Sequence, residues 1–429
     1  MHIEKISNKA WFIWIIGGLF FLIDYFIRVS PSVITGQLMS SFHTNAFVLG
    51  GLSAIFYYAY IAMQIPVGII FDRFNIKKPL IFAIVVCAVG AFLFALAHNI
   101  VMLYISRFLM GFSGAFAFIG ALKIIQNFFP VKYFSVLAGI TQALGMLGAA
   151  FGGSPMSFLM HSFGWRQVMF VVGIIFIALT LGIMLSISDK ILVHPNTKSP
   201  DSNKILANLV DVIFKRKQTL INSLYVGFLY GPTAAFAGLW GVPYFTLYHH
   251  ESTTMAAGQV SMIFIGLTFG CPLIGWFSNY MGKRLPVMRL SAILSLLLMV
   301  IVLFSNQLAL LRHISPDMLF VILFLYGFFN SGIIPSYTLA AESNRFHSGG
   351  IALAFTNMAS ILIGALLLPI IGKLLDFTWA GGMTHHHRLY TIYNYQISLA
   401  VLPVCFIISL IASYFIKETY CNYLLEEDN

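Results

Sequence analysis

The chain has 429 residues, of which 59% are hydrophobic and only 9% are charged. A water-soluble domain of ordinary composition is about 25% charged, so the composition excludes that class and indicates a membrane protein. The formal net charge of +10 does not indicate a nucleic-acid partner, because the sequence lacks basic patches interleaved with aromatic residues.

Apolar runs long enough to cross a bilayer recur along the whole sequence. A helix rises about 1.5 Å per residue, so about 20 apolar residues span the hydrocarbon layer. Twelve runs are predicted, at 10–34, 46–70, 79–97, 100–126, 134–158, 167–187, 219–246, 256–278, 286–305, 316–340, 349–375 and 392–416. The even number places both chain ends on one side. The first run is too long for the apolar part of a signal peptide and is expected to be retained as a helix.

The positions of lysine and arginine predict the orientation. With the amino terminus in the cytoplasm, the basic residues on the outer side are Arg166, Arg312, Lys373 and Arg388, whereas most of the 24 basic residues lie on the inner side. Membrane proteins carry this excess on the cytoplasmic side. We therefore expect both termini in the cytoplasm, a bacterial inner-membrane location, and anionic lipid beside the basic loops.

The first run contains one charge of each sign. Asp24 and Arg28 stand four residues apart in "FFLIDYFIRVSP", so they share a helix face near the middle of the membrane. A charge at that depth costs about 2.5–3.5 kcal/mol and requires a partner or a watery cavity. Two alternatives follow. The two residues neutralise each other, or Arg28 binds an anionic group of a substrate while Asp24 exchanges a proton.

Further polar residues lie in the second helical run. Tyr57, Tyr60 and Gln64 fall on one helix face, which we favour over Tyr58 as the face toward a cavity.

The fourth and fifth runs add a cation and an amide. Arg107 lies about 10 Å inside the fourth run and is expected either to bind substrate or to pair with Asp24. Lys123, at the inner end of the same run, is expected to extend toward the membrane surface. Gln142 in the fifth run is a further hydrogen-bond donor.

Small residues at a spacing of four occur in the fifth and eighth runs. They are Gly148 with Gly152, and Gly266 with Gly270. This spacing lets helices approach closely, either as a moving seam between two halves or as static packing. Pro155 is expected to kink the fifth helix.

The longest polar stretch divides six runs from six. We expect an amino-terminal six-helix bundle at 1–187, a cytoplasmic linker at 188–217 and a carboxy-terminal six-helix bundle at 218–429. Within the linker, 205–214 is either a short helix on the membrane surface or a solvated tether.

The second half offers mainly uncharged polar groups at middle depth. The candidates for substrate contact are Tyr225, Tyr230, Trp240, Asn330 and Asn357. For the two asparagines, hydrogen bonding between helices is an equal alternative.

The two halves repeat each other. "GIIFDRFNIKK" (68–78) matches "GWFSNYMGKR" (275–284) at an offset of 207, and "RFLMGF" (107–112) matches "LFLYGF" (323–328) at an offset of 216. Arg107 aligns with Leu323, so the costly cation occurs in one copy only. Duplicated membrane halves with a site near the bilayer midplane are typical of secondary transporters.

The loop after the second run resembles the signature of the major facilitator superfamily. The pattern is G-x-x-x-D-R followed by basic residues, with a degenerate copy after the eighth run; the residues are Gly68, Asp72, Arg73, Lys77, Lys78 and, in the copy, Asn279. Asn75 and Ile76 depart from the family's usual glycine and frequent basic residue. The resemblance covers the whole chain. It implies an all-α membrane protein with twelve transmembrane helices in two pseudo-symmetric six-helix bundles.

The resemblance also implies a conformational latch. In the family fold Asp72 lies beside the amino-terminal end of helix eleven, at 349–350, where unpaired N–H groups attract an anion. The basic residues of the loop are possible partners of Glu342. Because the second copy has neutral Asn279, the two latches are expected to differ in strength.

Within the superfamily, "FFLIDYFIRVSPSV", "RFLMGFSGAFAFIGALK" and "TQALGMLGAAFGG" look similar to the proteobacterial intraphagosomal amino acid transporters, and more loosely to anion:cation symporters of organic acids. The implied function is proton-coupled import of a small carboxylate-bearing solute, an amino acid or related nutrient, by alternating access. Alternatives are transport of organic acids or of a polycarboxylate siderophore, proton-driven efflux, and a sensor that does not transport. We expect a monomer with no enzymatic activity, cofactor or nucleic-acid partner. The loop histidines His385, His386 and His387 are expected to be solvated rather than to hold a metal.

Overall fold

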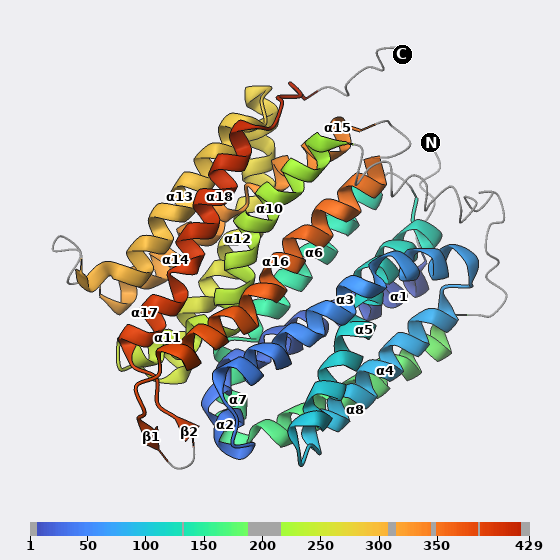
Figure 1. Ribbon diagram of the computed structural model, residues 1–429. Coiled ribbons are helices and arrows are strands. Elements are labelled where there is room, and N and C mark those ends of the chain that lie inside the picture. The colour runs from blue at the N-terminus through green and yellow to red at the C-terminus, as the bar shows by residue number, and fades with distance from the viewer. Residues whose placement is uncertain are drawn as a thin grey trace. The chain divides into compact units, whose positions relative to one another are not determined.

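The computed structural model describes residues 7–130, 133–187, 216–307, 315–344, 349–384 and 387–421. These residues are almost entirely helical, and each of the twelve predicted runs corresponds to helical structure (Figure 1). The predicted all-α membrane fold is confirmed. The possible surface helix at 205–214 lies outside the described residues.

The first six runs form the helices up to Ser186. Their elements are α1 (Asn8–Val29), η1 (Ser30–Val33), α2 (Thr35–Ser41), α3 (Ala46–Arg73), α4 (Lys77–Ala95), α5 (Ile100–Phe128), α6 (Phe134–Phe151), α7 (Ser154–Phe163) and α8 (Trp165–Ser186).

The last six runs begin at Lys217. Their elements are α10 (Lys217–Ala235), the π-helical turn η4 (Phe236–Trp240), α11 (Gly241–Tyr248), α12 (Thr253–Met281), α13 (Leu285–Phe304), η5 (Ser305–Gln307), α14 (Pro316–Asn330), α15 (Ile333–Glu342), α16 (Gly349–Thr378), α17 (Ile392–Leu399) and α18 (Val401–Tyr414). Strands β1 (Met383–Thr384) and β2 (His387–Arg388) pair antiparallel between α16 and α17.

Ten helical segments in the described ranges are long and apolar enough to cross a membrane alone, and the bent pair α6–α7 makes an eleventh. The remaining predicted run, 219–246, is also helical but divides into α10, η4 and α11. Between α6 and α7 the axis bends by 45°. The kink predicted from Pro155 is confirmed. Proline in the first turn of α7 has no N–H to continue the ladder of α6.

The chain divides into two compact units. The first takes its residues from Met1–Ile34 and Ile55–Ser199, and the second from Thr35–Ala54 and Pro200–Asn429. In the first, α1 packs against α5 and α6, and α4 packs against α5 and α8. In the second, α10 packs against α16 and α18, and α12 against α14. The segment 35–54, which the predicted boundaries assign to the amino-terminal bundle, groups with the second unit.

Hydrogen bonds explain this grouping. Asp376, near the end of α16, accepts the Phe47 N–H at 3.0 Å, and the Tyr390 hydroxyl accepts the Ala46 N–H at 3.1 Å. The first N–H groups of a helix have no partner within the helix, and a carboxylate is favourable at that end. Arg388 donates to the other oxygen of Asp376 at 2.9 Å. The start of α3 is therefore capped by residues of the second unit.

The predicted repeat is visible as the same close packing contact in each unit. A Cβ atom on Gly111 of α5 would clash with the carbonyl oxygen of Phe56 on α3, and a Cβ atom on Gly327 of α14 would clash with that of Ile263 on α12. The two pairs are separated by the offsets of 216 and 207 seen in the sequence. Each contact needs glycine because two helix backbones touch there.

The other predicted small-residue positions also pack inside their own units. Gly148 and Gly152 face the α1 backbone at Leu22 and Phe26, and Gly266 and Gly270 face the α14 backbone at Phe324 and Phe328. These contacts support static packing, the alternative to a moving seam.

Candidate substrate-binding site

A buried ion pair lies inside the first unit. Nη2 of Arg28 donates to Oδ2 of Asp24 at 2.8 Å, and the two side chains are 6% and 0% exposed. The predicted mutual neutralisation is therefore present. It is incomplete, because Asp24 Oδ1 and Arg28 Nε have no hydrogen-bond partner among the described residues. Buried polar atoms are normally paired, so each exception requires an explanation.

The Asp24 carboxylate lies directly against the backbone of α5. A Cβ atom on Gly114 would clash with Asp24 Oδ1, so only glycine leaves room for the carboxylate there. Gly114 is therefore part of the site, although a glycine carries no functional group that could have marked it.

Aromatic rings surround the guanidinium of Arg28. Its Cζ atom lies near four ring centroids, those of Tyr25 (4.1 Å), Tyr60 (4.8 Å), Phe56 (5.3 Å) and Tyr57 (5.8 Å). The negative faces of such rings attract a cation. They hold the guanidinium in place and leave its remaining N–H groups able to donate.

The predicted face of α3 lies at this cluster. The rings of Tyr57 and Tyr60 lie near Arg28, Gln64 hydrogen-bonds Tyr60, and Tyr58 is half-buried. Sequence reasoning missed Tyr25 and Phe56. Tyr25 precedes Arg28 by three residues, which is a usable signal because such residues are neighbours on a helix. Phe56 has no polar group that could have marked it.

Arg107 donates its hydrogen bonds to backbone carbonyls of α1, and substrate binding by this residue stays a prediction. Its Nη1 and Nη2 donate to the backbone carbonyls of Ile27 at 2.8 Å and Arg28 at 3.2 Å. Its side chain is 0% exposed, and its Cζ atom lies 4.7 Å from the centroid of the Phe56 ring. These acceptors are backbone carbonyls and not the Asp24 carboxylate, so the hydrogen bonds do not support the alternative of a direct pair with Asp24.

The cluster carries more positive than negative groups. One carboxylate, on Asp24, lies with the two guanidiniums of Arg28 and Arg107. A guanidinium recognises carboxylates through parallel N–H donors. The arrangement favours an anionic ligand over a cationic one.

Three candidates of the second unit have packing roles. Their side chains are 0% exposed, and each polar group donates to a helix carbonyl: Tyr225 to Met288 (2.8 Å), Trp240 to Leu368 (3.1 Å) and Asn330 to Leu229 (3.0 Å). For Asn330 this is the predicted alternative of a bond between helices. Such bonds satisfy polar groups in an apolar interior.

The other predicted ligands keep partly exposed side chains. Gln142, Tyr230 and Asn357 are half-buried. Asn357 accepts a hydrogen bond from the Tyr337 hydroxyl at 3.2 Å. These three residues stay candidates for substrate contact.

The predicted latch at Asp72 stays a prediction, because the side chains of Asp72 and Arg73 are outside the described residues. The following turn is described. Asn75, where the family usually has glycine, accepts the N–H of Lys77, the first residue of α4, at 3.2 Å. Gly68 has open space around its Cα, and Lys78 is exposed.

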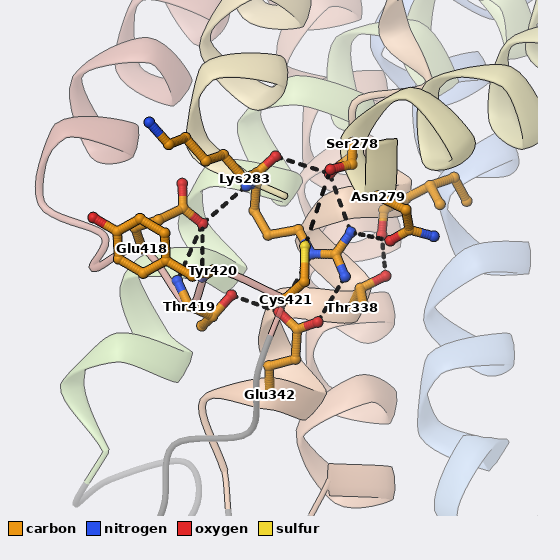
Figure 2. A network of polar contacts seen from close by, with 11 residues as sticks. Ser278, Asn279, Lys283, Thr338, Glu342, Glu418, Thr419, Tyr420 and Cys421 are labelled. Atoms are coloured by element: carbon orange, nitrogen blue, oxygen red, sulfur yellow. Dashed lines mark hydrogen bonds and ion pairs between the residues drawn. The ribbon is translucent and has the colours of Figure 1, made fainter. Parts of the chain in front are cut away.

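Glu342 has a partner that the sequence analysis did not propose. Arg284, which aligns with Lys77 in the repeat, donates to the Glu342 carboxylate through Nη2 at 2.7 Å and Nε at 3.3 Å. Figure 2 shows Thr419 facing the same carboxylate, to which it donates a hydrogen bond. Arg284 is thus the partner of Glu342 within the second unit, and the predicted pairing with Arg73, Lys77 and Lys78 stays a prediction.

Asn279 supports the same arginine. Its Oδ1 accepts from Arg284 Nη1 at 2.6 Å (Figure 2). Glu418, beyond the last helix, accepts the backbone N–H groups of Arg284 at 2.9 Å and Leu285 at 2.8 Å, and so caps the start of α13. Glu418 and Thr419 therefore connect the segment after α18 to the start of α13 and the end of α15.

Breaking this buried pair is expected to destabilise the protein. Glu342→Gln leaves Arg284, which is 3% exposed, without its counter-charge, and loss of one partner of a buried pair typically costs about 3–5 kcal/mol. We expect the thermal-unfolding midpoint of the purified protein to fall by several degrees, and the double variant Glu342→Gln/Arg284→Gln to recover part of it.

Arg388→Gln is the matched control. It breaks the pair with Asp376, in which the arginine side chain is 32% exposed, so the loss should be smaller. Equal midpoints for Glu342→Gln and the wild type would contradict a stabilising role for the network.

Comparison with known proteins identifies the family. The model of the Major Facilitator Superfamily matches residues 13–369. The matched region runs from α1 into α16 and includes all residues of the Asp24–Arg28–Arg107 cluster.

Two relatives with named substrates are similar to this chain. The probable galactarate/D-glucarate transporter GarP of Escherichia coli (strain K12) is 24% identical over 83% of this chain and 87% of its own length. The probable sulfoacetate transporter SauU of Cupriavidus necator is 29% identical over 38% of each chain.

A solved structure has the same fold. A bacterial homolog of the human lysosomal transporter Spinster, in an inward-facing and occupied conformation, superposes with a TM-score of 0.76 at 16% identity. The superposition covers 96% of this chain and 97% of the other.

Proposed function

This chain belongs to the Major Facilitator Superfamily, and from that premise we propose that it is a secondary active transporter of a small carboxylate-bearing organic anion. It is a multi-pass membrane carrier and not an enzyme. The observation that carries the substrate class is the buried Arg28 guanidinium, which rings hold in place and whose Nε lacks a partner. A guanidinium held in this way binds a carboxylate through charge-assisted N–H···O hydrogen bonds.

Small hydroxylated acids are the first candidates. The named substrates of two relatives, galactarate or D-glucarate and sulfoacetate, are organic acids with further polar groups. In this chain the rings of Tyr25, Tyr57 and Tyr60 lie around Arg28, and their hydroxyls can form hydrogen bonds to such groups.

An amino acid is the second candidate, and one observation favours it. Asp24 Oδ1 is a buried acceptor without a partner, which suits the ammonium group of a zwitterion whose carboxylate lies on Arg28. The two candidates differ in charge. Only the amino acid requires an anionic Asp24 while it is bound.

Proton coupling follows from competition for Arg28. When a substrate carboxylate takes the guanidinium, Asp24 loses the partner that it has at 2.8 Å. A buried carboxylate without a counter-charge is costly, and protonation removes that cost. Each anion would then enter with a proton on Asp24, and uptake would be driven by an inward proton gradient. We further propose a monomer in the bacterial inner membrane. The distribution of basic residues supports an orientation with both termini in the cytoplasm.

The test uses purified protein in two steps. Thermal-shift measurements with D-glucarate, galactarate, sulfoacetate and single amino acids should find the class that stabilises the folded protein, since a ligand that binds only the native state raises its stability. Uptake of that solute into proteoliposomes, with and without an inward proton gradient, then measures transport. Binding without uptake under either condition would contradict a transporter and favour the sensor alternative.

A further inference from the structure

A break in α1 lies immediately after Arg28. The α-helix ends at Val29 and continues as the tighter turn Ser30–Val33, which contains Pro31. In an α-helix the carbonyl of residue 27 accepts from the N–H of residue 31. Proline has no N–H, so the carbonyl of Ile27 loses its regular partner at this point.

Two side chains replace the missing donor. The Ser30 hydroxyl and Arg107 Nη1 each donate to the Ile27 carbonyl at 2.8 Å. Arg107 Nη2 also reaches the Arg28 carbonyl at 3.2 Å. A cation at the carboxyl end of a helix is favourable because the terminal carbonyls carry partial negative charge. Arg107, a residue of α5, thus caps the carboxyl end of a different helix, α1.

The position of Arg107 is itself fixed by packing. Its Cζ atom lies 4.7 Å from the Phe56 ring centroid, and Gly111, one turn further along α5, touches the Phe56 backbone. The guanidinium is 0% exposed. The side chain is therefore held between α1, α3 and α5, and its two hydrogen bonds are directed at the α1 backbone.

We propose that Arg107 is a positioning residue, which replaces the backbone hydrogen bond that Pro31 removes and so fixes the turn of α1 that carries Arg28. This inference rests on the proposed function, in which Arg28 binds the substrate carboxylate. It gives Arg107 a supporting role in place of the predicted contact with substrate or with Asp24. The transported anion is held by Arg28, and Arg107 acts through the carbonyls of Ile27 and Arg28.

The experiment is a double-mutant cycle between Arg107 and Pro31. In Arg107→Gln the end of α1 loses charge-assisted hydrogen bonds, so hydrogen exchange in a peptide covering 25–34 should become at least about tenfold faster. In the Pro31→Ala background, residue 31 supplies an N–H to the freed carbonyl. The same Arg107→Gln change should then accelerate exchange less than threefold. Equal acceleration in both backgrounds would overturn the proposal.

Transport provides the readout that separates positioning from direct binding. With D-glucarate as the first probe, and then any acid or amino acid that the wild type transports, Arg107→Gln should lower uptake at least about tenfold. Arg107→Gln/Pro31→Ala should recover most of that loss, whereas Arg28→Ala/Pro31→Ala should recover none. If uptake by Arg107→Gln/Pro31→Ala stays as low as uptake by Arg107→Gln alone, Arg107 is a direct ligand of the substrate and the proposal is wrong.

Hydrogen exchange tests the capping role of Arg107, and uptake tests the proposed transport function, so one proposal can be wrong while the other holds. Hydrogen exchange needs no substrate, so it decides the capping role even if the protein transports no anion. Arg107→Lys, which keeps the charge but offers one donor nitrogen, guards against misfolding of the glutamine variant. It should show intermediate exchange, and exchange as fast as in Arg107→Gln would contradict a role for two directed bonds.

Discussion

Replacement of Arg28 by alanine is expected to abolish saturable binding and uptake. The substrate carboxylate would lose its charged donor, the guanidinium of Arg28, whose side chain is only 6% exposed. Loss of one partner of a buried, hydrogen-bonded charge pair costs about 2–5 kcal/mol, which is at least about thirtyfold in affinity. Isothermal titration and proteoliposome uptake with the solute identified by thermal shift would measure the effect.

Two controls separate binding from folding. Arg28→Ala leaves Asp24 buried without a counter-charge, so Arg28→Ala/Asp24→Asn should regain folded yield but not binding. Arg166→Ala removes an exposed arginine in the same unit and should leave uptake near the wild-type rate. An Arg28→Ala protein that takes up solute as fast as the wild type would remove this residue as the anchor.

Replacement of Asp24 by asparagine is expected to separate transport from the proton gradient. The asparagine amide occupies a volume similar to that of the aspartate carboxyl group but does not take up a proton as a carboxylate does. Substrate exchange between the two sides of a proteoliposome should continue, whereas accumulation driven by an inward proton gradient should fall to the level seen without a gradient.

Exchange and accumulation must be measured on the same preparation. If accumulation keeps its full dependence on the gradient in Asp24→Asn, the coupling group lies elsewhere. Loss of binding as well as accumulation would instead favour the amino acid candidate, because an ammonium group needs the anionic carboxylate.

The sequence predicted the helices well because their signal is physical and local. An apolar run of about 20 residues has one stable form in lipid, since only a helix satisfies its own backbone groups. The breaks were harder to predict. Pro155 predicted the bend between α6 and α7. The breaks at η4, Ser331 and Ala400 also precede a proline in the first turn of the next helix, at Pro243, Pro335 and Pro403. Proline alone does not predict a break, because Pro66, Pro272 and Pro369 lie inside continuous helices.

For the site, helical spacing predicted neighbours on one helix but not across helices. It placed Asp24 beside Arg28, and Tyr57 on one face with Tyr60. It could not predict that Arg107 donates to carbonyls of α1, because those acceptors are backbone atoms present at every residue. The partner of Glu342 was accessible in principle, since the repeat aligns Arg284 with the basic loop of the first half.

The paired glycine contacts have a consequence for how selectivity can be altered. Gly111 and Gly327 make the same contact in the two copies, although ionised groups at middle depth are confined to the first copy. These shared helix–helix contacts are therefore encoded by residues other than the charged ones. A redesign that moves a cation to Leu323, the counterpart of Arg107, would place a charge where the present side chain is 0% exposed, so it would have to supply a buried partner as well.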